Sequence, residues 1–231
     1  MKLDEGYMFG IGAFETILIK DSKAVFIDDH LKRLRDSLDL LCIENDIAKS
    51  DVLSYISERK IENGILKIMV SKENIILSFR DNQYTKEDYL RGFKLCVSEV
   101  LRNETSKLTY IKSFNYGDNI LEKRAAKAKG YDEPIFLNTK GYISEGATSN
   151  IFFIKDNTIY TPRIENGLLN GIMRTKVLEK YEVKEVDIKY DEIGQYEEVF
   201  ITNSILGIMP VRSINEYNFT IDKVRNITIE M

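Results

Sequence analysis

Residues 111–138 read IKSFNYGDNILEKRAAKAKGYDEPIFLN, in which one lysine precedes a helix and then a strand. Asp118 can cap a helix that runs to Ala128, and the glycine two positions later is typical of a helix end. The residues from Ile135 to Asn138 read as a strand. Lys112 lies between apolar and aromatic neighbours, and partial loss of hydration makes an amine more nucleophilic. The stretch alone leaves open that Lys112 only lies along apolar surface with its ammonium in water.

The preceding part of the chain predicts a hairpin, two helices and two more strands. Asp28 and Asp29 stand where a helix N-cap belongs, and leucines follow at spacings of three and four. The expected elements are the hairpin Ala13–Ile19 and Ala24–Ile27, the helices Asp29–Cys42 and Ser50–Ile61, and the strands Ile65–Ser71 and Asn74–Phe79.

The following part predicts a connection over residues 81–92 and a strand over residues 93–100. Residues 101–107 have little apolar content and predict an interdomain linker, with the boundary between 105 and 115. Beyond residue 135 the chain predicts antiparallel hairpins, a helix over residues 171–180 and a strand over residues 198–202. The fold class is therefore α/β (α+β). A small N-terminal domain (1–107) precedes a larger, mostly antiparallel, β-rich domain with helices (108–231).

The composition excludes several classes of function. The 231 residues include 33 Lys+Arg, 37 Asp+Glu, one histidine and two cysteines, which gives a net charge of −4. A zinc site of cysteine and histidine ligands or a redox dithiol needs more of these residues, and a mildly acidic chain lacks the basic surface of a nucleic-acid binder. No apolar run spans a membrane and no signal peptide is recognisable, so we expect a cytoplasmic protein with no membrane partner.

Three further segments carry polar residues in places that neither a core nor an ordinary surface requires. Residues 141–150 contain Glu145 in a polar loop that enters an apolar strand. Residues 168–175 place Asn-Gly at a helix start, where free backbone N–H groups can bind an anion. Residues 30–34 place Arg33 at the border of a buried helix face, and His30 is interpreted as a structural histidine. Polar loops, helix starts and border arginines of these kinds are also common in proteins where they bind no ligand.

Together these segments closely resemble the fold type IV family of pyridoxal-phosphate enzymes, the class IV aminotransferase-like proteins. That family includes branched-chain and D-amino-acid aminotransferases and 4-amino-4-deoxychorismate lyases. The resemblance rests on five segments in this order: FGIGAFETILIKD, HLKRL, IKSFNYGDNILEKRAAKAKGYDEPIFLN, GYISEGATSNIFFIKDNTIYTPR and GLLNGIMR. It covers essentially the whole chain, and the joint match is far more specific than any single segment.

The resemblance implies a pyridoxal 5′-phosphate cofactor and assigns its binding residues. Lys112 matches the lysine that forms the Schiff base, and Glu145 matches the carboxylate that keeps the pyridine nitrogen protonated. Tyr116 matches the tyrosine that hydrogen-bonds the phenolate oxygen. The residues that match the phosphate-binding groups are the Arg33 side chain, the backbone N–H groups of Ile172 and Met173, and Ser204.

Within the family, GAFETI, YTPR and NGIMR resemble the lyase branch, which makes 4-aminobenzoate and pyruvate for folate biosynthesis. In that case Lys112 serves as nucleophile, base and acid, Thr16 helps to position the substrate or transfer a proton, and Arg163 binds a substrate carboxylate. One alternative is an aminotransferase that acts on D-amino acids or branched-chain amino acids. A second alternative is a non-catalytic module of the same fold.

Two departures from the family pattern affect these expectations. Family members usually begin with roughly twenty more residues, so we expect either a smaller first sheet or a partner subunit that covers its exposed edge. Met173 replaces a threonine that is common in the aminotransferases, but only its N–H group is needed for phosphate. The resemblance also implies a homodimer.

Overall fold

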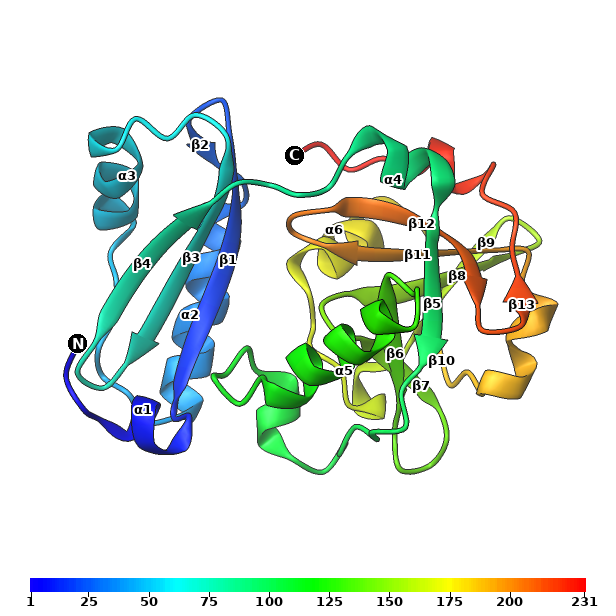
Figure 1. The fold of residues 1–231 in the computed structure, drawn as a ribbon, viewed down its shortest axis with the longest axis horizontal. Helices are drawn as coiled ribbons and strands as arrows, with labels where there is room; N and C mark the ends of the chain where they lie inside the picture. Colours follow the sequence, from blue (N-terminus) through cyan, green and yellow to red (C-terminus); the bar gives the residue numbers. More distant parts are fainter. The chain divides into compact units, whose positions relative to one another are not determined.

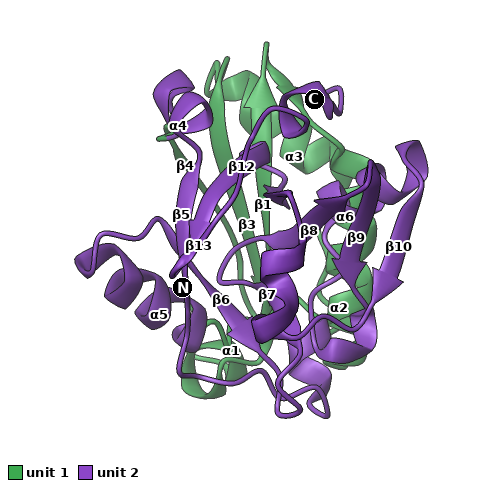
Figure 2. Ribbon diagram, turned by 90° about the vertical axis from the view of Figure 1, so that its right-hand side faces the viewer, with its two compact units in different colours: residues 1–83, 111–116, 231 green, residues 84–110, 117–230 purple.

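The computed structural model describes residues 1–231, which form two compact units (Figure 2). Unit 1 comprises residues 1–83, 111–116 and 231, and unit 2 comprises residues 84–110 and 117–230. The chain thus leaves unit 1 at residue 83, earlier than the expected boundary between 105 and 115. The segment 93–97 pairs with strands of unit 2, and the segment that carries Lys112 belongs to unit 1.

Unit 1 is built on a four-stranded antiparallel sheet in the order β2-β1-β3-β4 (Figure 1). Its strands are β1 (Gly12–Lys20), β2 (Lys23–Ala24), β3 (Gly64–Ser71) and β4 (Ile75–Arg80). β1 and β3 pair along almost their whole length, with Thr16 opposite Lys67. The expected strands are confirmed to within one residue for β3 and β4, and Leu66, Ile68 and Val70 of β3 lie on one buried face.

Two helices cover the unit 1 sheet. They are α2 (Ile27–Leu40), which lies along β1 in Figure 1, and α3 (Lys49–Glu58), and the short α1 (Glu5–Phe9) precedes the sheet. Leu31 and Leu34 of α2 and Val52 of α3 enter one apolar core with Ile17 of β1. This burial is the main source of stability for the unit, since each fully buried aliphatic side chain contributes about 1.5–3 kcal/mol.

The expected helix boundaries in unit 1 need correction. α2 begins two residues before Asp29, and its N-cap residue is Phe26, in the left-handed conformation with φ of 53°. Asp28 and Asp29 lie in the first turn, where their charges suit the positive end of the helix dipole. Ser50 lies inside α3, whose N-cap is Ala48. Tertiary burial of the leucine face, rather than a side-chain cap, sets where α2 starts.

Unit 2 contains a nine-stranded mixed sheet, in the order β10-β9-β8-β11-β12-β5-β6-β7 with β13 beside β12. The strands are β5 (Phe93–Val97), β6 (Glu133–Leu137), β7 (Ile143–Gly146), β8 (Asn150–Lys155), β9 (Thr158–Pro162), β10 (Val183–Val186), β11 (Glu198–Asn203), β12 (Gly207–Ile214) and β13 (Tyr217–Asn218). Most neighbouring pairs are antiparallel, as expected, but β5–β12, β5–β6 and β9–β10 are parallel. β7 also contacts β8 and β9, so the sheet curls back on itself.

Each face of this sheet is buried. Phe153 and Ile201 lie in one apolar cluster, whereas their neighbours Phe152 and Phe200 lie in another with Val177 of α6 (Ile172–Lys180). The rings of Phe152 and Phe200, which are cross-strand partners, stack with centroids 4.8 Å apart. Alternate residues point to opposite faces of a strand, so the continuous apolar run at 151–154 indicates a strand covered on both sides.

The remaining helices are α4 (Lys86–Arg91), α5 (Gly117–Ala128) and the 3-10 helices η1 (Lys107–Tyr110), η2 (Ile164–Asn166), η3 (Tyr190–Gln195) and η4 (Val224–Asn226). α5 confirms the expected helix, but it begins at Gly117, so Asp118 lies inside its first turn and is not the N-cap residue. α4 was missed, although Thr85 and Asp88 form a capping box that its sequence signals. The polar loop expected before residue 150 contains β7. No helix among residues 1–231 is long and apolar enough to cross a membrane.

Candidate active site

The segment that carries Lys112 is held against β1 by backbone hydrogen bonds. Phe14 N–H donates to the carbonyl of Lys112 at 2.8 Å, and Phe114 N–H donates to the carbonyl of Gly12 at 2.8 Å. A Cβ atom on Gly12 would lie 2.4 Å from the Phe114 ring, so only glycine allows this approach. The position of the Lys112 backbone is therefore fixed by the sheet and not by a flexible linker.

Two aromatic rings surround the Lys112 ammonium. Its Nζ lies 4.5 Å from the ring centroid of Phe14 and 5.0 Å from that of Tyr116. The two rings meet edge to face, with centroids 5.1 Å apart. Such a cation–π arrangement holds the amine in one orientation between the two rings.

A second lysine approaches the same ring from β3. Lys67 Nζ also lies 4.5 Å from the Phe14 centroid, and burial together with the charge of Arg80 lowers the pKa of Lys67. The sequence analysis missed this residue. Its signal is a lysine at the centre of the apolar strand 65–70, opposite Thr16.

Arg33 forms a buried cluster with Glu15 and His30. Arg33 Nε and Nη2 each donate to a different oxygen of Glu15 at 2.7 Å, and His30 Nδ1 lies 2.7 Å from Glu15 Oε2. Burial raises the pKa of Glu15, but Arg33 and His30 outweigh it and hold that pKa at about 2. Burial lowers the pKa of His30, and the attraction of Glu15 offsets only part of this. The cluster is thus an ion pair of Arg33 and Glu15 beside a neutral imidazole.

Glu15 is the main residue that the sequence analysis did not identify. Glu15 lies between Phe14 and Thr16 in the sequence of β1, and its side chain is completely buried. It fixes the Arg33 guanidinium by a bidentate ion pair. A carboxylate inside an apolar strand is the signal, because a buried charge needs a partner. Arg33 Nη1 takes no part in the contact with Glu15. Its N–H groups are suited to bind a phosphate group.

In unit 2, Glu145 lies near the end of β7 and is 8% exposed. Its Oε2 accepts a hydrogen bond from the backbone N–H of Leu169 at 3.1 Å, and its Oε1 lies 3.2 Å from Arg102 Nε. One contact comes from the loop before α6 and the other from the segment after β5. These two contacts fix the orientation of the Glu145 carboxylate. A carboxylate that accepts a hydrogen bond from the nitrogen of a pyridine ring needs such a fixed orientation.

The loop before α6 is held by Asn150, whose side-chain amide donates to the Leu169 carbonyl at 2.8 Å. Gly171 is the N-cap residue of α6, and a Cβ atom there would lie 2.1 Å from Asn150 Oδ1. Ile172 and Met173 follow in the first turn, with buried side chains. Their backbone N–H groups lie at a helix start that has no side-chain cap, which is a suitable place for a phosphate.

Arg174 anchors the start of α6 from inside. It is 2% exposed, donates to Asn170 Oδ1 at 3.0 Å and to the Pro162 carbonyl at 3.2 Å, and forms an ion pair with Glu185. The sequence analysis quoted this residue within NGIMR without giving it a role. The contacts show that it links the loop to β9 and β10.

Ser204 follows β11 in a turn shaped by Asn203. The side-chain oxygen of Asn203 accepts hydrogen bonds from the N–H groups of Ile205 and Leu206, each at 2.9 Å. The adjacent Thr202 has a buried hydroxyl without a hydrogen-bond partner in the structure. Such an unsatisfied hydroxyl fits a site that receives a polar ligand, because burying it without a partner is unfavourable.

The two predicted substrate contacts lie on different units. Thr16 lies on β1 of unit 1, next to Glu15. Arg163 belongs to unit 2, has a side chain 54% exposed, and lies 3.8 Å from Asp187 Oδ1 through its Nε. A side chain this exposed is equally typical of an ordinary surface arginine.

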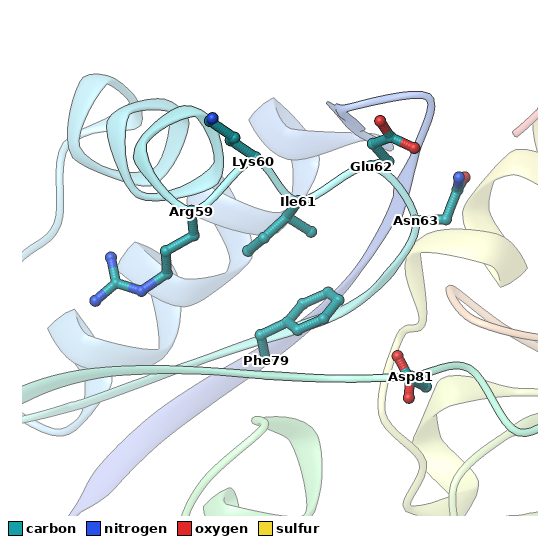
Figure 3. Close-up of a pocket in the computed structure, with 7 residues that line it drawn as sticks. All are labelled: Arg59, Lys60, Ile61, Glu62, Asn63, Phe79 and Asp81. Carbon is teal, nitrogen blue, oxygen red and sulfur yellow. The ribbon is translucent and has the colours of Figure 1, made fainter.

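A surface hollow in unit 1 contains none of these residues (Figure 3). It is lined by Arg59, Lys60, Ile61, Glu62, Asn63, Phe79 and Asp81. Its charges are of both signs, and Figure 3 shows their side chains spread around the hollow without converging on one point. It therefore provides no charge-selective binding site.

Each unit, taken by itself, carries groups of the kinds that the family resemblance assigns to pyridoxal-phosphate binding. Unit 1 carries an amine between aromatic rings and a fixed guanidinium, and unit 2 carries a fixed carboxylate, an uncapped helix start and a buried unpaired hydroxyl. The residues present fit the cofactor. The fold and these groups define a pyridoxal-phosphate enzyme of fold type IV.

The chain belongs to the amino-transferase class IV family, whose model matches residues 12–214. Enzymes of this family depend on pyridoxal 5′-phosphate. The resemblance inferred from the sequence and the expected cofactor are thereby confirmed.

Relatives with different activities are similar to the chain to about the same degree. It is 28% identical to an aminodeoxychorismate lyase of Bacillus subtilis (strain 168), over 94% of this chain and 82% of that protein. It is 29% identical to a D-alanine aminotransferase of Bacillus licheniformis, over 92% of this chain and 82% of that protein. A putative 4-amino-4-deoxychorismate lyase structure from Legionella pneumophila covers 98% of this chain and 93% of that one, with a TM-score of 0.87 and 28% identity. Similarity alone therefore shows the family and not the reaction.

Proposed function

We propose that the protein is a 4-amino-4-deoxychorismate lyase that forms 4-aminobenzoate and pyruvate. The observation that carries this proposal is the fixed position of Lys112 beside Phe14 and Tyr116, with its backbone hydrogen-bonded to β1, the strand that also carries Thr16. A lyase needs one amine that can accept and then return a proton. The similarity over nearly the whole chain to a lyase of Bacillus subtilis supports the same activity.

The proposed cofactor-binding residues are those that the family resemblance assigns. Lys112 would bind the cofactor aldehyde covalently, Tyr116 would donate to its phenolate oxygen, and Glu145 would hold the proton on its ring nitrogen. The phosphate is bound by Arg33, by the N–H groups of Ile172 and Met173 at the start of α6, and by Ser204 with the Thr202 hydroxyl. When bound, the cofactor withdraws electrons from the carbon that carries the substrate amine.

The amine of Lys112 performs the proton transfers. Its free amine would take the proton from the ring carbon that bears the substrate amine. The carbon–oxygen bond to the enolpyruvyl group then breaks and the ring becomes aromatic. Lys112 returns the proton to the methylene carbon of the departing group, which leaves as pyruvate. Thr16 orients the substrate, and Arg163 is proposed to meet a substrate carboxylate.

A product assay tests the proposal directly. Purified protein is loaded with pyridoxal phosphate and given 4-amino-4-deoxychorismate, and 4-aminobenzoate is followed by fluorescence while pyruvate is measured separately. We expect the two products in equal amounts. Protein that binds the cofactor but forms neither product would contradict the lyase assignment.

An aminotransferase is the second candidate, supported by the similarity to D-alanine aminotransferase over 92% of this chain. It would use the same Lys112, Glu145, Tyr116 and Arg33. Incubation with 2-oxoglutarate and either D-alanine or a branched-chain amino acid distinguishes it, because only an aminotransferase forms glutamate. A protein that does not bind pyridoxal phosphate at all would instead be a non-catalytic module of this fold.

A further inference from the structure

Arg102 occupies a fixed position in unit 2, between β5 and η1. Its N–H group donates to the carbonyl of Leu137 at 2.8 Å, and it forms a parallel bridge with Asn138. The backbone of Arg102 thus continues the pairing of β5 with β6. A residue held in this way presents its side chain in one defined direction.

The Arg102 guanidinium is enclosed on several sides. Its carbon Cζ lies 3.9 Å from the ring centroid of Phe136, and its Nη1 donates to Asn119 Oδ1 at 3.2 Å. Asn119 is itself fixed, because its amide donates to the Ala147 carbonyl at 2.6 Å. The Arg102 side chain is only 12% exposed. Stacking on an aromatic face and a planar fork are properties of arginine that lysine does not reproduce.

The third neighbour of this guanidinium is Glu145. Arg102 Nε lies 3.2 Å from Glu145 Oε1, yet Nε and Nη2 are buried and have no hydrogen-bond partner in the structure. The contact between Arg102 Nε and Glu145 Oε1 is therefore mainly a charge–charge attraction and not a well-aligned hydrogen bond. Burying a cation with unsatisfied N–H groups is costly, and a structural side chain of this size could be aliphatic at lower cost. The placement indicates that the positive charge itself is required beside Glu145.

We propose that Arg102 is a positioning residue that keeps Glu145 ionised, so that the proton between Glu145 and the cofactor ring stays on the ring nitrogen. This inference rests on the proposed function, in which Glu145 faces that nitrogen. A positive charge this close lowers the proton affinity of a carboxylate by roughly ten- to a thousandfold. Without it, a carboxylate in a buried site would take up the proton more readily, and the ring would withdraw electrons less strongly.

The test is the protonation state of the ring nitrogen, measured by ¹⁵N NMR on holoenzyme loaded with ¹⁵N-labelled pyridoxal phosphate. The parent protein should show a protonated nitrogen near neutral pH. Arg102→Met, which keeps an apolar contact with Phe136, should shift the signal towards the unprotonated value and lower kcat about tenfold or more. Arg102→Lys, which keeps the charge, should restore the signal at least in part. Arg124→Met, at an exposed position of α5, should match the parent.

Glu145→Gln separates failure of this inference from failure of the proposed function. If Glu145→Gln shifts the signal and Arg102→Met does not, Arg102 has no such role and the function of Glu145 stands. If Glu145→Gln also leaves the nitrogen protonated, the proposed role of Glu145 fails and this inference with it. Should Arg102→Met not fold, Arg102→Gln provides the second neutral variant for the comparison with Arg102→Lys.

Discussion

The proposed chemistry depends on the side-chain amine of Lys112. We expect Lys112→Ala to lower turnover at least about 10³-fold, because the variant loses both the nucleophile and the general base. Borohydride reduction of the holoenzyme followed by mass spectrometry should attach the cofactor to the parent and not to the variant. Lys129→Ala, on an exposed position after α5, is the control. Turnover by Lys112→Ala at the parent rate would contradict every catalytic assignment.

The Glu15 carboxylate governs both a local ion pair and the acid stability of unit 1. Glu15→Gln should destabilise the fold by about 3–5 kcal/mol near neutral pH, since it leaves Arg33 without its buried partner. The pKa of Glu15 is lowered from 4.5 to about 2, so its stabilising contribution is present above pH 4.5 and is lost as the pH falls through 2.

The measurement for Glu15 is urea unfolding at several pH values between 2 and 7. The parent should lose stability at the acid end more steeply than Glu15→Gln. Glu44→Gln removes an exposed carboxylate of the same unit and should behave like the parent. Equal acid dependence for parent and Glu15→Gln would show that the Glu15 carboxylate does not carry this effect.

At the scale of elements, the loop between β9 and α6 depends on the absence of a side chain at Gly171. Gly171→Ala should lower cofactor affinity about tenfold, because its Cβ atom would lie 2.1 Å from Asn150 Oδ1 and displace the N–H groups at the helix start. Titration with pyridoxal phosphate, followed by absorbance, measures the effect. Gly117→Ala is the matched control at the start of α5, where a Cβ atom has no neighbour within 4 Å. An unchanged dissociation constant for Gly171→Ala would contradict this account of the loop.

Some helices and strands could be predicted from the sequence and others could not, for a physical reason. α5 and β3 have local signals, an acidic residue in the first turn of α5 and β-branched residues along β3, and both lie within one residue of the expected bounds. β5 also has a strand signal, but it pairs with β12 and β6, so its assignment to the N-terminal domain did not follow from its own residues. Which strand pairs with which is decided by distant segments, and periodicity carries no such information.

At the scale of the whole molecule, the homodimer stays a prediction. The short helix α1 leaves Tyr7 70% and Phe9 66% exposed, and large apolar side chains that gather on one exposed element favour association. Light scattering after size-exclusion chromatography should give the mass of two chains. The double variant Tyr7→Ser and Phe9→Ser should shift the equilibrium towards one chain, whereas a monomeric parent would contradict the prediction.

The sequence by itself determined the family and the cofactor, because the five segments together resemble one known family, and that resemblance predicts the residues that match the cofactor-binding groups. Only the tertiary structure decided that Glu15 fixes Arg33 and that Arg102 lies against Glu145. Those pairs join residues 18 and 43 positions apart, and each depends on how strands and helices pack. A buried charge signals that a partner exists, but only folding brings a particular partner within contact distance.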